Sequence, residues 1–364
     1  MFIDRIILEK FNRVMSVVIY YIVFLAFSSG LLLLSRTLKS NIIIFSFAVL
    51  IAIFFSGFRH DAGNDYFTYY GMAKGYYWFD KLEISPRILL SIAKTYDSPM
   101  LYFLSTSIIY ITSVAYFCWK RSKNPELSFF LFLSLPLSLL TSFGYVRQYV
   151  AIGLFLLSLS TFIDKRYILS SLFFILAVSF HTSAIIFIVI FIFYKFLSNR
   201  IYPIWLYLAL MAVSYPVAFF IAEYAYLAGN YQEYLIGAKA VDSGKKIGLV
   251  CVALFFYFWL FNRHLKSKDD IYIFNIYYVF ALIYLILMDF GEYVSRVSYY
   301  LMPCSYVLFV STLYLRKNIR AIQICGIICF SLAMFFATLY FASTNPVRDF
   351  LTNYSLILFY TMPN

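Results

Sequence analysis

Two isolated ionisable side chains, Arg147 and His181, interrupt long apolar stretches of the sequence, and Arg296 lies at the start of another. A charge-bearing group is costly in such surroundings, so it usually faces a cavity or a partner of its own. The guanidinium fork of arginine suits phosphate or pyrophosphate, because it can donate two parallel hydrogen bonds. An imidazole can act as a general base near neutral pH. These residue types therefore predict chemistry on a phosphate-bearing substrate.

A further polar group lies in the segment FSGFRHDAGNDYFTYYG, residues 55–71. Aromatic and carboxylate side chains of this kind suit the binding of sugars. Asp65 is the main competitor of His181 as general base, and it could instead orient a sugar. The alternative is an aromatic belt at a membrane interface, with Arg59 reaching the lipid headgroups. The candidates for substrate binding in this segment are Arg59, Asn64, Tyr66 and Tyr70.

Arg147, His181 and Arg296 each have a structural interpretation as well. Arg147 would be an ordinary loop arginine between two short helices, and His181 a structural histidine bonded to neighbouring hydroxyls. Arg296 would form a salt bridge with Asp289 or Glu292. If Arg296 instead binds substrate, the adjacent candidates are Tyr299 and Tyr300. Together, the predicted catalytic residues are His181, Asp65 and Arg147.

The composition requires a membrane around these groups. Of the 364 residues, 63% are hydrophobic and only 13% are charged, whereas a soluble domain is nearer half apolar and a quarter charged. The net charge of +12 is spread over short loops between apolar stretches rather than along one stripe, which argues against nucleic acid as a partner. We therefore expect an all-α polytopic membrane protein that forms a single transmembrane domain, residues 1–364.

A membrane-spanning helix needs about 20 apolar residues, and the sequence predicts about 12 such helices. They are expected at 14–35, 41–57, 99–119, 126–146, 148–163, 166–181, 182–197, 201–222, 246–261, 271–289, 293–315 and 321–342.

The loops between these helices fall into two sets. One set is short and rich in Lys and Arg, which assigns it to the cytoplasm by the positive-inside rule. The other set contains a long external loop at 58–98, with interfacial elements, and a second external loop at 223–245. Arg59, Arg147, His181 and Arg296 all lie close to predicted helix ends on this second side. That placement favours chemistry at a membrane surface over transport through the bilayer.

Several motifs are absent from the sequence. It contains no phosphate-binding glycine-rich loop of the nucleotide-binding type and no HExxH zinc motif. Asp61 and Asp65 form one pair beside a single histidine, His60, which is a poor set of metal ligands. We therefore expect neither a metal nor another cofactor.

Four segments follow one another along the chain: Phe58-Arg59 … Gly63-Asn64-Asp65-Tyr66 … Tyr70, Arg147-Gln148 … Ala151, His181-Thr182-Ser183-Ala184 and Arg296 … Tyr299-Tyr300. In this order they resemble motifs of the Wzy/EpsG-type bacterial polysaccharide polymerases, which include the O-antigen polymerases. The resemblance extends from about residue 55 to the tail. It implies a GT-C-like membrane glycosyltransferase fold related to the O-antigen ligases.

The resemblance also implies a function. It is that of a hexosyltransferase-type polymerase, which joins oligosaccharide repeat units linked to undecaprenyl pyrophosphate into O-antigen, as in lipopolysaccharide, or exopolysaccharide. The partners would be these lipid-linked oligosaccharides, membrane lipids and a chain-length regulator protein. The location would be the bacterial cytoplasmic (inner) membrane, with the active site facing the periplasm or exterior. The alternatives are a lipid-linked oligosaccharide flippase or other transporter, and an O-antigen ligase.

Overall fold

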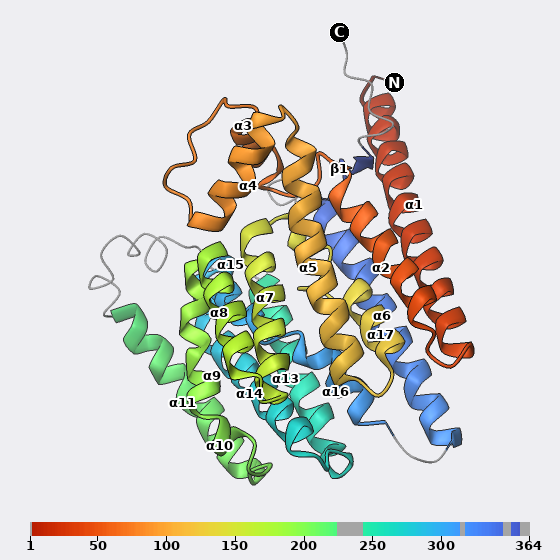
Figure 1. Ribbon diagram of the computed structural model, residues 1–364. Helices are drawn as coiled ribbons and strands as arrows, with labels where there is room; N and C mark the ends of the chain where they lie inside the picture. The colour runs from red at the N-terminus through yellow and green to blue at the C-terminus, as the bar shows by residue number, and fades with distance from the viewer. Residues whose placement is uncertain (1, 224–242, 314–316, 345–350, 357–364) are drawn as a thin grey trace. The chain divides into compact units, whose positions relative to one another are not determined.

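The computed structural model describes residues 2–223, 243–313, 317–344 and 351–356, which are almost entirely helical (Figure 1). They cluster into two compact units, residues 1–184 with 324–364 and residues 185–323. The helical architecture confirms the prediction of an all-α membrane protein, apart from one pair of two-residue strands. The single transmembrane domain and the relationship to GT-C enzymes stay predictions.

Six helices in the described part of the chain are long and apolar enough to cross a membrane. They are α1 (Phe2–Thr37), α5 (Pro99–Arg121), α7 (Val146–Ile163), α11 (Ile204–Glu223), α14 (Lys268–Leu287) and α17 (Lys317–Thr344). Shorter apolar helices include α2 (Ile42–Gly57), α6 (Pro125–Ser134) and α8 (Tyr167–Phe180). The predicted number of about 12 spans stays a prediction.

Three of the predicted continuous helices are broken in the structure, so these assignments were wrong. The segment 126–146 contains only α6 and the short η1 (Thr141–Phe143), because Pro136 and Leu137, with φ of 57°, stop the helix. The segment 293–315 divides at Pro303 into η6 (Arg296–Tyr300) and α16 (Cys304–Ser311), after the short α15 (Glu292–Ser295). The segment 182–197 divides into η2 (Thr182–Phe187), α9 (Ile188–Ile192) and α10 (Tyr194–Leu197).

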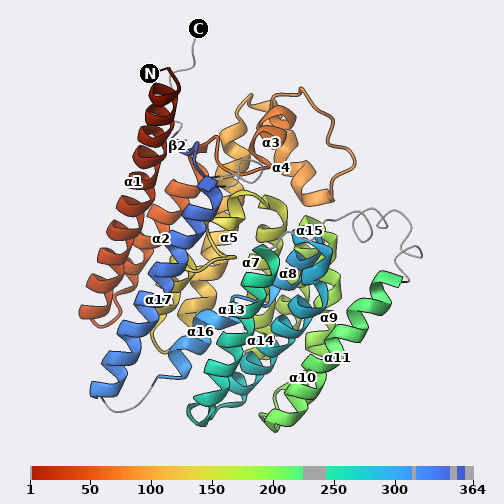
Figure 2. The same cartoon turned by 180° about the vertical axis from the view of Figure 1, so that it is seen from behind.

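The first unit is built around α5, which packs against α2, α6 and α7. The segment predicted as the long external loop, 58–98, contains β1 (Arg59–His60), α3 (Tyr66–Ala73) and α4 (Ile84–Thr95). Both views show α3 and α4 at the end of the unit where α5 begins (Figures 1 and 2). β1 pairs in antiparallel register with β2 (Ser355–Leu356), so the end of the described chain closes over the start of this segment.

The second unit is organised by α14, which packs against α10, α11, α13 (Ser243–Leu260) and α16. Short turns complete it: η4 (Asn262–His264) and η5 (Met288–Phe290). The buried Asp270 of this unit accepts hydrogen bonds from Ser267 and Ser311. Most of the predicted second external loop, 223–245, lies outside the described residues.

Candidate functional site

The packing of α7 against α8 brings Arg147 and His181 to the same end of the first unit. A short turn at 164–166 joins the two helices, and Lys165 adopts a φ of 62° there. The helices therefore run antiparallel, and the first turn of α7 lies level with the C-terminal cap of α8. Arg147 lies in the first turn of α7, and His181 is the C-terminal cap of α8.

Glu83 connects these two residues. It is the residue before α4, and its side chain makes no hydrogen bond to its own helix. One carboxylate oxygen, Oε2, accepts a hydrogen bond from Nη1 of Arg147, and the other, Oε1, lies 3.1 Å from Nδ1 of His181. The backbone N–H of Thr182 donates to the same Oε1 at 3.4 Å. Three segments that are far apart in sequence thus meet at one carboxylate.

The electrostatics of this group fix the tautomer of the histidine. Burial raises the pKa of Glu83, but the hydrogen bond from His181 and the charge of Arg147 lower it by more, so its pKa falls to about 2. An ionised carboxylate only accepts hydrogen bonds. Nδ1 of His181 must therefore carry the proton, which leaves Nε2 as the basic nitrogen of the neutral ring. A carboxylate that orients an imidazole in this way is a familiar arrangement for a general base.

Arg147 is held by two directed hydrogen bonds and keeps a third donor group available. Its Nε donates to the hydroxyl oxygen of Tyr69 at 2.7 Å, and its Nη1 to Glu83. Burial raises the pKa of Tyr69 to about 12, so this phenol stays neutral. Within the described residues, Nη2 has no hydrogen-bond partner, and about a quarter of the side chain is exposed. The arginine is therefore oriented and can still bind an anion.

The other predicted residues of the first motif lie around α3. Asp65 precedes α3 and is half-buried, one helical turn before Tyr69, while Asn64 is exposed. Tyr66 is fully buried, and its ring stacks on Phe103 at a centroid distance of 4.7 Å. The half-buried ring of Tyr70 lies 6.0 Å from that of Tyr66. Asn64 and Tyr70 thus have solvent-accessible surface, whereas Tyr66 contributes to the core.

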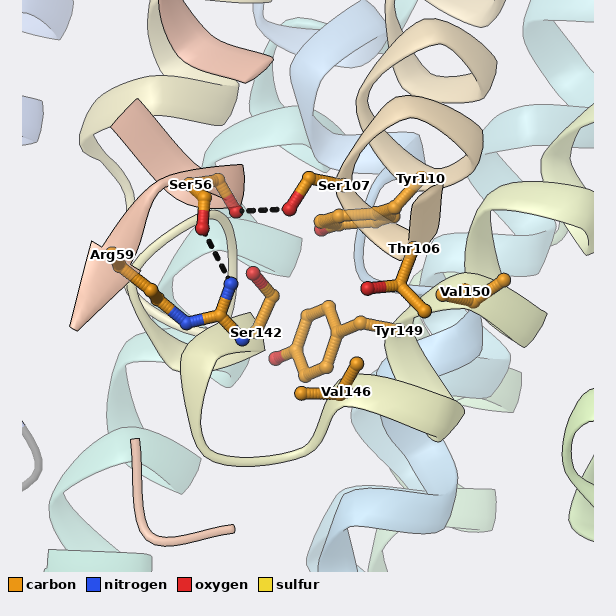
Figure 3. Close-up of a pocket in the computed structure, with 9 residues that line it drawn as sticks. All are labelled: Ser56, Arg59, Thr106, Ser107, Tyr110, Ser142, Val146, Tyr149 and Val150. Atoms are coloured by element: carbon orange, nitrogen blue, oxygen red, sulfur yellow. Dashed lines mark hydrogen bonds between the residues drawn. The ribbon is translucent and has the colours of Figure 1, made fainter. Parts of the chain in front are cut away.

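Arg59 lies inside the helical bundle, with only 2% of its surface exposed (Figure 3). Its Nε donates to the carbonyl oxygen of Ala62 at 3.1 Å and its Nη1 to that of Ser56 at 2.5 Å. Its guanidinium also packs between the rings of Phe103 and Phe143, 4.8 Å from each centroid. These contacts stabilise the turn after α2. The predicted contact of Arg59 with substrate stays a prediction.

Arg59 has no carboxylate partner among the described residues, and burial lowers its pKa to about 10. It therefore remains charged at neutral pH. The adjacent cavity has a volume of about 10 Å³ and is lined by hydroxyl groups, including those of Ser107, Thr106 and Ser142 (Figure 3). That volume holds about one water molecule, so it has no room for a sugar or a phosphate.

Gly63 is required at the turn between β1 and α3. Its φ is +110°, and an added Cβ would lie 1.9 Å from the carbonyl oxygen of Phe143, well inside contact distance. We predict that Gly63→Ala separates this turn from the 141–144 segment and lowers the amount of folded protein. Fluorescence-detected size-exclusion chromatography in detergent, after heating, measures the change. Gly30→Ala is the matched control, since nothing lies within 4 Å of its added Cβ. Equal thermal stability of the two variants would contradict the prediction.

The last predicted group lies in the second unit. Arg296 begins η6 and is half-buried. Tyr299 and Tyr300 are buried there, where the first stacks with Tyr284 and the second with Phe187. These tyrosines contribute to the core of the unit. The predicted convergence of Arg59, Arg147 and Arg296 on one pyrophosphate stays a prediction.

Sequence reasoning missed Glu83 and did not select Tyr69. Glu83 belongs to no recognisable motif, but it directly precedes an amphipathic stretch, Ile84–Thr95. An acidic residue at that position is typical of a helix start. Its pairing with Arg147 and His181 depends on how α4 packs against α8, which the sequence does not reveal. Within the described chain, no group of three His, Cys, Asp or Glu residues could hold a metal ion.

The six membrane-length apolar helices among the described residues define the chain as a polytopic helical membrane protein. Residues 42–356 match the EpsG family, and the chain belongs to this family. This result confirms the resemblance seen in the four motifs. Membership indicates a polysaccharide polymerase-type role with glycosyltransferase-like activity. Neither a curated protein nor a solved structure matches the chain.

Proposed function

We propose that this protein is a polysaccharide polymerase that joins oligosaccharide repeat units linked to undecaprenyl pyrophosphate, at the outer face of the cytoplasmic membrane. The Glu83–Arg147–His181 cluster is the main observation that supports this proposal. It combines an oriented base with a cation that keeps a free donor group, which are the two parts that glycosyl transfer from a lipid pyrophosphate needs.

In the proposed reaction, a hydroxyl oxygen of the acceptor unit attacks the anomeric carbon of the donor glycan. Nε2 of His181 takes the hydroxyl proton as the new carbon–oxygen bond forms. The bond from the anomeric carbon to the phosphate oxygen breaks, and its electron pair leaves with undecaprenyl pyrophosphate. Nη2 of Arg147 binds the phosphate and stabilises the negative charge that develops on it. Glu83 keeps both side chains in place through the two oxygens of its carboxylate.

The positions of these groups agree with a reaction at the membrane surface. Arg147 and His181 lie at helix ends, and Glu83 lies in the segment that the distribution of Lys and Arg assigns to the outside. Asn64 and Tyr70 come from the same segment and would bind the sugar rings.

Deletion of the gene tests the proposal through the pattern of surface polysaccharide on a gel. We predict that the ladder of long chains is replaced by single repeat units, because the units are made and exported but are no longer joined. Plasmid-borne wild-type protein should restore the ladder. Complete loss of surface sugar, with lipid-linked units retained inside, would contradict the proposal and indicate a flippase. Full-length chains that remain attached to lipid would indicate a ligase.

A further inference from the structure

Helix α4 exposes a continuous stripe of isoleucines. Ile84, Ile88 and Ile92 follow each other at one-turn intervals and are 61%, 54% and 46% exposed. At four-residue spacing they cover one narrow face of the helix. Because no described residue of the first unit covers these large aliphatic side chains, they form an apolar surface that would be unfavourable in water.

The opposite face of α4 already packs against the core of the first unit. Leu90 and Ala93 are fully buried in a cluster that includes Tyr69 and Val146. Tyr69 accepts a hydrogen bond from Arg147, and Val146 directly precedes Arg147, so the inner face of α4 packs in the same cluster as residues next to the candidate site. The isoleucine stripe is therefore a second apolar face, and the core of the unit does not require it.

The surroundings of the stripe match the headgroup region of a membrane. Arg87 and Lys94 lie two turns apart along one edge of α4, between the buried face and the isoleucines. Lys94 is exposed and would reach lipid phosphates from that position, whereas Arg87 is half-buried and its Nε is enclosed. The segments next to α4 carry highly exposed aromatic residues of the kind found at membrane interfaces: Tyr76, Tyr77, Trp78 and Tyr96.

The stripe also adjoins the apolar outer surface of α8. α4 packs against the C-terminal end of α8, and the hydroxyls of Ser85 and Ser179 lie 2.7 Å apart. Three aliphatic residues farther along α8 are strongly exposed, as expected for a helix that faces lipid: Ile168, Leu172 and Ile175. The lipid around α8 would therefore reach α4 without a break.

We infer that α4 is an interfacial helix, with its isoleucine stripe in the acyl chains of the membrane and its basic edge among the lipid headgroups. Since Glu83 directly precedes α4, this attachment also fixes the carboxylate that orients Arg147 and His181. The effect on Glu83 rests on the proposed function, whereas the position of α4 in lipid does not.

Spin labels on single introduced cysteines test this position in the full-length protein, reconstituted in phospholipid vesicles. The background replaces the exposed Cys325 and Cys329 by serine and keeps the three buried cysteines. Labels at positions 84, 88 and 92 should be relaxed by oxygen, which concentrates in lipid, and protected from a water-soluble nickel chelate. A label at exposed Asp80, three residues before Glu83, is the matched control and should show the reverse.

Relaxation of the three stripe labels by the nickel chelate would overturn the inference, because it would place the stripe in water. Protection from both reagents would also overturn it, because protein, such as a second copy of the chain, would then cover the stripe. These outcomes are independent of catalysis, so failure of this inference is distinguishable from failure of the proposed polymerase activity.

Discussion

Replacement of His181 by asparagine should abolish the polysaccharide ladder while the protein remains at its normal level in the membrane. The asparagine amide can occupy the place of Nδ1–H and keep the hydrogen bond to Glu83, but it has no basic nitrogen in the position of Nε2. Loss of a general base typically lowers the rate by about a hundred- to ten-thousand-fold. Any loss of activity in this variant is therefore a loss of base rather than of local structure.

Chain length on a gel, normalised to protein level, measures this effect. His264→Asn is the matched control, since His264 lies on η4 in the second unit and should leave the ladder unchanged. A normal ladder from His181→Asn would remove His181 from the chemistry. Asp65 would then become the leading candidate for the general base.

Arg147→Lys should also lose most activity, although it keeps the positive charge. The guanidinium donates to Tyr69 and to Glu83 with two different nitrogens and retains a third for the substrate. A lysine ammonium is a single point donor that cannot hold this planar arrangement. The variant should therefore bind lipid-linked pyrophosphate weakly and leave Glu83 and His181 less well oriented.

Rates of polymerisation in membranes that contain equal amounts of protein measure this loss. The matched control is Arg121→Lys, since Arg121 also forms an ion pair with an acidic residue, Asp164, and hydrogen-bonds Ser160. It lies at the end of α5 away from the candidate site, so its replacement should spare the rate per molecule. Equal losses from the two variants would mean that the Arg147 fork has only a structural role.

Part of this site could be predicted because its residues interrupt apolar sequence. Arg147 and His181 stand alone in long uncharged stretches, and the alternation of helices places both at one side of the membrane. The family match spans both residues, since it covers residues 42–356, while their roles in the reaction stay predictions. Glu83 could not be predicted in the same way, because it lies in a polar segment where one more acidic residue gives no signal.

For Arg59, the sequence predicted an exposed side chain that the structure shows to be buried. An arginine next to His60 and Asp61, just after an apolar helix, suggests an exposed group at the interface. In the structure its guanidinium instead bonds backbone carbonyls and packs between two phenylalanine rings. Those rings come from α5 and from the segment before α7, so this burial depends on long-range packing. Local sequence contains no information on such contacts.

The breaks in the predicted helices have a similar origin. Pro136 and Pro303 lie inside two of the apolar stretches, but a proline there can be tolerated in a membrane helix when neighbours satisfy the freed carbonyl. The positive φ of Leu137 shows that the chain turns there instead. The segment 182–197 contains no proline or glycine, so its division into three short helices could not be predicted from the sequence.

Polymerisation by the purified protein tests the central claim most directly. The protein would be reconstituted in phospholipid vesicles with undecaprenyl-pyrophosphate-linked repeat units, and the products would be separated by length. We predict chains of two or more units with release of undecaprenyl pyrophosphate, in the presence of EDTA, and no such chains from His181→Asn. Transfer of intact lipid-linked units across the vesicle membrane, with no new glycosidic bond, would contradict the account.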